Sequence, residues 1–70
     1  MREYIINNVI ALRKEMDVRQ EDLAKALGVS RQTIIAIEKG NYIPSLLLGL
    51  KIAKFFKQPV EEVFTYIYEK

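Results

Sequence analysis

Three consecutive polar residues, Arg31, Gln32 and Thr33, have the types best suited to specific recognition in this chain. A guanidinium presents paired N–H donors, and a carboxamide presents a donor beside an acceptor, so each can form two hydrogen bonds with one planar partner. Guanine offers a matching edge to arginine, and adenine offers one to glutamine. These residues therefore suit hydrogen bonding to the edges of nucleic-acid bases, with Gln32 the first candidate.

A helix is predicted to carry these side chains. At about 100° per residue, Ile34 and Ile37 share an inner face. Four residues point away from it, namely Gln32, Ile35, Ala36 and Lys39. Ser30 directly precedes this helix and is placed to cap it by accepting a hydrogen bond from a free backbone N–H. An outward face with an amide and a cation is suited to reading another molecule.

A second short helix is predicted immediately upstream. Leu23, Ala24 and Leu27 fall at helical spacing and form one narrow apolar stripe, enough for about two turns. Gly28 is expected to end this helix, because glycine adopts positive φ without steric cost. Residues 20–39 thus form a helix, a short turn and a helix, in which the small Ala24 lets the two helices cross closely.

Two interpretations of this unit are open on spacing alone. A helix-turn-helix motif places its second helix in a DNA major groove. An ordinary antiparallel pair of helices with a solvated polar face has the same apolar pattern. The wider sequence is needed to decide between them.

The wider sequence resembles the Xre family of lambda- and 434-repressor-like transcriptional regulators, from about residue 9 to residue 64. The matching residues are Gln20, Leu23, Ala24, residues 27–34, Ile37, Glu38, Gly40, residues 44–46 and residues 51–53. The flanking segments YIINN and VFTYIY look like those of small single-domain members such as the cytolysin repressor. The resemblance implies a mainly α, five-helix lambda-repressor-like DNA-binding domain over residues 1–70, with the helix-turn-helix core at 20–39.

The resemblance also implies which residues contact DNA. Gln20 would offer its side chain or its helix-terminal N–H to a phosphate, and residues 31–33 would reach base edges or the adjoining backbone. Ile35 and Ala36 can offer only apolar contact, for example to thymine methyl groups; the alternative for Ile35 is packing in the core or an interface. The expected DNA-contacting residues are Arg19, Gln20, Ser30, Arg31, Gln32, Thr33, Ile35, Ala36, Lys39 and Asn41.

The expected function is sequence-specific binding of double-stranded DNA by a homodimeric transcriptional regulator, a repressor by resemblance, on a two-fold operator. The expected dimer interface comprises Ile43, Leu47, Phe64, Tyr66 and Tyr68. A second hypothesis is a protein-interaction module, such as the antitoxin half of a toxin pair, in which these apolar residues hold a different protein.

Composition argues against other classes of protein. The chain has 70 residues, no cysteine and no histidine, which removes disulfides, the usual zinc and haem ligands and the commonest general base. No paired carboxylates or nucleophile stand out, so we expect neither an enzyme nor a metal, cofactor or small-molecule site. One domain of this size has a small core, so a partner chain would help to stabilise it.

Localisation and charge are less informative. The first eight residues lack the apolar core of a secretory signal, and the longest apolar run, residues 46–50, is too short to span a bilayer. A cytoplasmic protein without a membrane contact is therefore expected. The formal net charge of +2 is only a weak indication of nucleic-acid binding.

Arg13 falls close to the apolar stripe of a first helix that is predicted to begin near Asn8 and to bury Val9, Leu12 and Met16. A charge there needs a partner. The resemblance implies an ion pair with Glu38 that joins the first and third helices. The alternative is that the Arg13 side chain extends to water.

Arg19 departs from the family pattern, which has a threonine or serine there as the N-cap of the second helix. Losing such a cap costs about 1 kcal/mol, so we expect compensation elsewhere. One hypothesis is that Arg19 adds a phosphate contact, and the alternative is that it lies free in solvent. Asp17 stands where relatives have glycine, and aspartate tolerates that left-handed conformation.

The remaining elements are predicted from local signals. Ser45 should cap a fourth helix that ends near Phe56, and Leu46, Leu50 and Ala53 are expected to cover the first three helices. Within that helix, glycine at position 49 should cost about 1 kcal/mol.

The two ends of the chain are strand-like. Proline at position 59 suits the first position of a last short helix that ends near residue 63. Residues 3–6 and 64–68 are rich in β-branched and aromatic side chains, so we expect them to pair as a two-stranded antiparallel ribbon.

Overall fold

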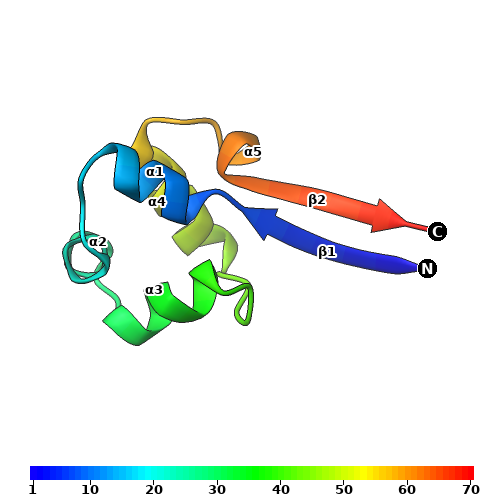
Figure 1. Ribbon diagram of the computed structural model, residues 1–70, viewed down its shortest axis with the longest axis horizontal. Helices are drawn as coiled ribbons and strands as arrows, with labels where there is room; N and C mark the ends of the chain where they lie inside the picture. The colour runs from blue at the N-terminus through cyan, green and yellow to red at the C-terminus, as the bar shows by residue number, and fades with distance from the viewer.

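A helical body and a projecting β-ribbon make up the molecule (Figure 1). The computed structural model describes residues 1–70. In chain order the elements are β1 (Arg2–Asn7), α1 (Val9–Glu15), α2 (Gln20–Leu27), α3 (Arg31–Glu38), α4 (Leu46–Phe56), α5 (Val60–Val63) and β2 (Phe64–Glu69). In Figure 1 the ribbon extends to the right of the helices, while α2 lies at the opposite side. The expected mainly α fold with five helices and a terminal ribbon is confirmed.

The turn between α2 and α3 is built by the predicted local signals. Gly28 lies in the left-handed region with φ of 75°, and the N–H of Val29 donates to the carbonyl of Ala24 at 3.0 Å. The Ser30 hydroxyl accepts a hydrogen bond from the N–H of Thr33 at 3.1 Å, which satisfies one of the free donors of α3. The helix-turn-helix unit at residues 20–39 therefore follows from its own sequence.

The core lies where the five helices meet and contains only apolar side chains. Its members are Val9, Leu23, Ala24, Leu27, Ile34, Ile37, Leu48, Ile52, Ala53, Phe56 and Val63. Ile34 and Ile37 are about 1% exposed, so the predicted inner face of α3 is confirmed. Anchoring α3 by these two side chains leaves its opposite face available to solvent.

The predicted buried face of α4 is wrong for two of its three members. Leu46 is 78% exposed and Leu50 is 48% exposed, while Ala53 is buried as expected. The buried stripe contains Leu48, Gly49, Ile52, Ala53 and Phe56. A helix can bury only one stripe against a given neighbour. The buried stripe runs along the whole of α4, whereas the stripe that begins with Leu46 and Leu50 is apolar mainly near the start of the helix.

Gly49 lies on the buried side of α4 beside Phe64, where the space available does not require a glycine. It is buried, and a Cβ added there would lie 3.9 Å from the ring of Phe64, which is an ordinary contact distance. The ring of Phe64 lies near α4 and packs against the core. Phe64 was expected to lie in a dimer interface; it is half-buried against the core, and its place in an interface stays a prediction.

Two predicted ends of helices also need correction. Met16 is exposed, because α1 ends at Glu15 and Met16 is its C-cap. Asp17 follows with φ of 57°, which confirms the expected left-handed conformation. Pro59 was predicted to be the first residue of the last helix and is instead the N-cap of α5, one position before Val60, where the helix begins.

The ribbon pairs β1 with β2 in antiparallel register, from Arg2 opposite Glu69 to Asn7 opposite Phe64. Side chains opposite one another share a face, so Ile5 and Tyr66 lie on the same face of the ribbon. The Tyr66 hydroxyl donates to Glu3 at 2.9 Å, which raises the pKa of Tyr66. These contacts hold the two strands in one register beyond the helical body.

None of the helices combines the length and the apolar character that crossing a membrane would require.

Candidate nucleic-acid interface

The outward face of α3 is centred on Gln32 and Lys39, which are both exposed. At about 100° per residue, these two positions lie about 170° from the middle of the buried stripe formed by Ile34 and Ile37. Ile35 and Ala36 flank the exposed centre at about 130° from the stripe, and the structure leaves both half-buried. An amide and an ammonium therefore stand out furthest from the body, with apolar groups beside them.

The start of α3 holds Ser30 and Thr33 in a cap. The two hydroxyl oxygens lie 3.0 Å apart, and the Ser30 oxygen also accepts the N–H of Thr33. Thr33 is half-buried, whereas Arg31 is exposed. Of the predicted residues at this end, Gln32 thus has the freest side chain, since Arg31 donates to Gln20 and the two hydroxyls are engaged with each other.

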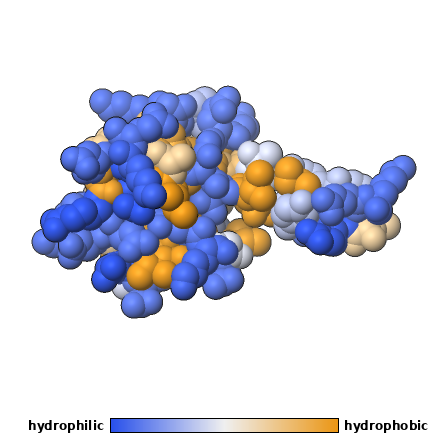
Figure 2. Space-filling model, in the orientation of Figure 1, coloured by the Kyte–Doolittle hydropathy of each residue, from blue (hydrophilic) through white to orange (hydrophobic).

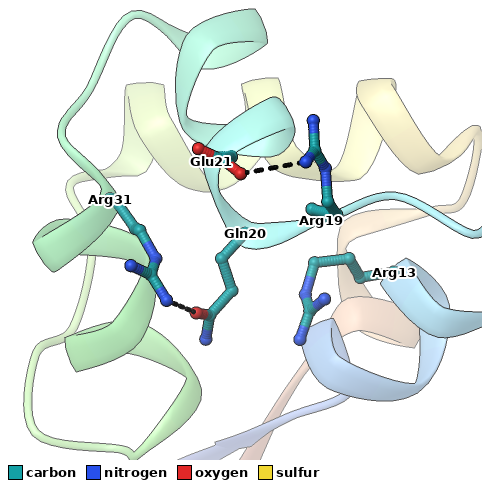
Figure 3. A pocket seen from close by; sticks show the side chains of 5 residues that line it. All are labelled: Arg13, Arg19, Gln20, Glu21 and Arg31. Carbon is teal, nitrogen blue, oxygen red and sulfur yellow. Dashed lines mark hydrogen bonds and ion pairs between the residues drawn. The ribbon is translucent and has the colours of Figure 1, made fainter.

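Gln20 lies between α3 and the rest of the interface. Its amide nitrogen donates to Glu38 Oε1 at 2.9 Å, and its amide oxygen accepts from Arg31 Nη2 at 3.4 Å (Figure 3). Both ends of the side chain are therefore occupied. The first N–H groups of α2 have no side-chain cap, and such free donors suit an anion. Of the two phosphate contacts considered for Gln20, the backbone donor is the one left available.

A polar depression surrounds the start of α2 (Figure 3). It has a volume of about 430 Å³ and is lined by Arg13, Arg19, Gln20, Glu21 and Arg31. Arg13 is paired there with Glu38, and Arg19 with Asp22 and Glu21, so Arg31 is the guanidinium without a carboxylate partner beside the start of α2. The Arg31 guanidinium and the free N–H donors of α2 are chemically suited to a phosphate group.

The ion pair between Arg13 and Glu38 is confirmed. Arg13 Nε lies 2.8 Å from Glu38 Oε2, and the two side chains are only 14% and 4% exposed. A further Arg13 nitrogen donates to the carbonyl of Val18 at 3.0 Å. The alternative in which Arg13 extends to water is therefore wrong. The pair joins α1 to the last residue of α3 and helps to set the direction of the latter.

The compensation expected at Arg19 is supplied by Asp22, three residues downstream. The Asp22 carboxylate accepts the backbone N–H of Arg19 at 3.3 Å, which is one half of a capping box. The guanidinium is exposed but paired, since its Nε donates to Asp22 Oδ2 at 3.0 Å and its Nη1 lies 3.2 Å from Glu21. The hydrogen bond to Arg19 lowers the pKa of Asp22, so this contact persists until the pH falls toward that lowered value.

Replacing Arg19 with threonine should stabilise the fold and weaken DNA binding without regard to sequence. Threonine can accept an N–H of the first turn of α2, which arginine cannot, and Asp22 can still complete the capping box. If Arg19 binds a phosphate, the slope of log affinity against log salt should flatten by about 0.9 for each phosphate that the variant no longer neutralises. Chemical denaturation and DNA titrations at several salt concentrations measure the two effects. A stabilised variant with its full salt slope would contradict the phosphate contact.

Lys39 and Asn41 lie at the far end of α3, and both are exposed. Gly40, between them, has φ of 80°, and the N–H of Asn41 donates to the carbonyl of Ala36 at 2.9 Å. This left-handed turn directs the chain away from the helix axis. Both side chains are accessible beside the outward face of α3.

The proposed interface residues do not form one patch. Ile43 and Tyr66 line a shallow depression of about 250 Å³ with Glu3, Tyr4 and Ile5, and Figure 2 shows apolar residues where the ribbon meets the body. Ile43, Leu47, Tyr66 and Tyr68 are exposed. Leu47 belongs instead to an exposed apolar stretch at the start of α4, with Leu46 and Leu50. The ribbon and Ile43 thus form one candidate contact surface, which we call the ribbon surface.

One residue near α3 was missed by sequence analysis. Asn7, at the end of β1, donates through Nδ2 to the carbonyl of Ile37 at 2.9 Å. Either of the two consecutive asparagines at positions 7 and 8 could have capped the first helix by its residue type. The N-cap of α1 is Asn8, whose side chain makes no capping hydrogen bond, whereas Asn7 Oδ1 accepts the N–H of Val9 at 3.1 Å.

Comparisons with known proteins agree with this geometry. The family model described as "Helix-turn-helix" matches residues 9–63. An uncharacterized HTH-type transcriptional regulator from Methanocaldococcus jannaschii is 68% identical over 50 residues, which cover 71% of this chain and 76% of that protein. The transcriptional repressor RstR of the cryptic phage CTXphi, from Vibrio cholerae, is 42% identical over 52 residues, which cover 74% of this chain and 47% of that protein.

A solved structure shows the same fold over nearly the whole chain. The crystal structure of the transcriptional regulator VanUg superimposes with a TM-score of 0.75 at 21% identity, covering 99% of this chain and 92% of that one.

Proposed function

Because this chain belongs to the helix-turn-helix family of transcriptional regulators, we propose that it binds a specific double-stranded DNA sequence by placing α3 in the major groove. The observation that carries the proposal is the outward face of α3, where Gln32 and Lys39 are exposed directly opposite the buried Ile34 and Ile37. A helix anchored on one side and polar on the other fits the width of that groove.

The individual roles follow from side-chain chemistry. Gln32 pairs with adenine and Arg31 with guanine or an adjoining phosphate. Ile35 and Ala36 contact thymine methyl groups with the parts of their surfaces that remain accessible. Lys39 contacts a phosphate near the end of α3. Ser30, Thr33 and Asn41 lie toward the two ends of α3 and suit hydrogen bonds to the DNA backbone rather than base reading. Arg19 and the backbone N–H of Gln20 contact a phosphate at the start of α2.

The protein acts as a homodimer on a two-fold operator and represses transcription. Two copies would carry a formal charge of +4, twice the +2 of one chain, and would bury the exposed Ile43, Tyr66 and Tyr68 of the ribbon surface. Similarity to the repressor RstR supports repression rather than activation.

The alternative is that the same surface holds a different protein. Size-exclusion chromatography with light scattering separates the two, because self-association requires no second component. A stable dimer of the pure protein supports the repressor. A monomer that aggregates through its ribbon surface would support the antitoxin-like module.

Replacing Gln32 with alanine should weaken binding to the specific operator by about 1 to 3 kcal/mol, or roughly 5- to 150-fold, with little effect on random DNA. The amide contributes sequence information, whereas phosphate contacts contribute affinity for any duplex. The operator is first obtained by selection from random DNA, and operator and scrambled duplexes are then titrated at one salt concentration. Equal losses on both duplexes would show that Gln32 contacts only the backbone.

A further inference from the structure

The last turn of α3 is held by polar side chains from three different elements. Arg13 of α1 and Gln20 of α2 both donate to the carboxylate of Glu38. Asn7, from β1, donates to the carbonyl of Ile37 at 2.9 Å. Two of these links tie α3 to the helical body, whereas the third ties it to the ribbon.

The amide of Asn7 uses both of its functions at once. Its nitrogen donates to Ile37 in α3, and its oxygen accepts the N–H of Val9 at the start of α1. Its backbone is the last pair of the ribbon, opposite Phe64. One side chain therefore joins the base of the ribbon, the start of α1 and the end of α3.

Little else connects the ribbon to α3. A depression of about 230 Å³ lies between them, lined by Ile5, Ile6, Asn7, Glu38, Lys39 and Gly40. Ile6, Lys39 and Gly40 are exposed, so apolar packing does not fill this space. The bond from Asn7 is the one side-chain hydrogen bond between the ribbon and α3. It is therefore the direct link between the two, in addition to Asn8 and Phe64, which hold the base of the ribbon to the rest of the body.

We propose that Asn7 is a positioning residue: by bonding Ile37 it fixes the ribbon relative to α3, and so sets the spacing of the two recognition helices in a dimer joined through the ribbon surface. This inference rests on the homodimer and the two-fold operator of the proposed function. The ribbon projects from the body (Figure 1), so a small change of angle at its base moves the partner subunit by a larger distance.

The chemistry of the site provides a variant that separates the two bonds. An aspartate at position 7 can still accept the N–H of Val9 but cannot donate to Ile37. It would also face the negative end of α3. A serine can accept the N–H of Val9 through a local turn, but its side chain is too short to reach Ile37 and carries no charge. Agreement between N7D and N7S therefore excludes an effect of charge alone.

The matched control is Asn8→Ser. The amide of Asn8 donates to the carbonyl of Glu62 at 3.2 Å, so it also anchors the ribbon region but does not touch α3. Asn7→Ser and Asn8→Ser are the same change at adjacent positions, and each removes one bond from an asparagine amide. Only the first is expected to alter the geometry of DNA binding.

The experiment measures affinity for operators whose two half-sites are one base pair closer, correctly spaced or one base pair further apart, and for a single half-site. The natural protein and Asn8→Ser should prefer the correct spacing by about tenfold. In Asn7→Asp and Asn7→Ser this preference should fall to within about threefold, because a loosened ribbon lets α3 meet several spacings. Binding to the single half-site should change little. Equal weakening at every spacing, or an unchanged preference, would overturn the proposal, since a residue that only stabilises the fold acts on all duplexes alike.

A measurement without DNA tests the positioning role separately. The chain has no cysteine, so spin labels can be attached at Arg2→Cys in the ribbon and Gln32→Cys in α3, with labelled chains diluted into unlabelled protein. Asn7→Asp should broaden the distribution of distances between the labels, and Asn8→Ser should not. An unchanged distribution would overturn the proposal. A broadened distribution with no spacing preference in the natural protein would contradict the dimeric operator instead, and would support the positioning role.

Discussion

Replacing Arg13 with methionine should lower the free energy of unfolding by about 3 to 5 kcal/mol, because it removes one partner of a buried ion pair. The Glu38 carboxylate is 4% exposed and would keep only the hydrogen bond from Gln20. Glu38 is also the last residue of α3, where the helix dipole disfavours a negative charge. The positive charge of Arg13 offsets both the burial of the Glu38 carboxylate and its unfavourable position at the end of the helix dipole. Methionine fills a similar volume but offsets neither. Denaturant titration with linear extrapolation measures the loss.

Two comparison variants identify the cause. Combining R13M with Glu38→Leu removes the unpaired carboxylate, so the double variant should be more stable than R13M alone. Arg2→Met breaks an exposed pair with Glu69 and should cost less than about 1 kcal/mol. If R13M lost no more stability than R2M, the pair would contribute alignment of α1 and α3 without appreciable stability.

Inserting half a helical turn, about 5 base pairs, between the operator half-sites should weaken binding by about 10²- to 10⁴-fold. Two α3 helices related by a two-fold axis meet successive major grooves on one side of the duplex, about 34 Å apart. The insertion turns one half-site to the far side, so only one subunit can bind base edges. The second subunit then no longer contributes through its high effective concentration. Titration of the natural and extended duplexes measures the change.

The control duplex carries an insertion of about one full helical turn, which returns both half-sites to the same side at a greater distance. A single half-site provides the lower limit of affinity. The half-turn duplex should bind no better than the single half-site. Affinity unchanged by the half-turn insertion would contradict the two-fold arrangement, although it would leave recognition by one α3 intact.

Local chemistry made the helix-turn-helix unit predictable from sequence. Gly28 adopts positive φ because a residue without a Cβ meets no steric penalty there. Ser30 caps α3 because its hydroxyl is close enough in the chain to accept an N–H of the first turn. The apolar period of Ile34 and Ile37 then selects the buried face of α3. The pair of Arg13 and Glu38 was implied by family resemblance rather than by spacing, and the structure confirms it. DNA binding by individual residues stays a prediction.

Tertiary structure decided the features that depend on distant partners. In α4 two apolar stripes were available, and the choice between them depended on which stripe the other helices and Phe64 could cover. Asn7 lies 30 residues before Ile37 in the chain, so no local sequence pattern could predict the hydrogen bond between them. Residues 20–39 specify a helix-turn-helix with a polar outward face, because capping, turn conformation and helical period act over a few residues. Packing in three dimensions decided which stripe is buried and which side chains join the ribbon to α3, because a hydrogen bond or an apolar contact exists only where two surfaces meet.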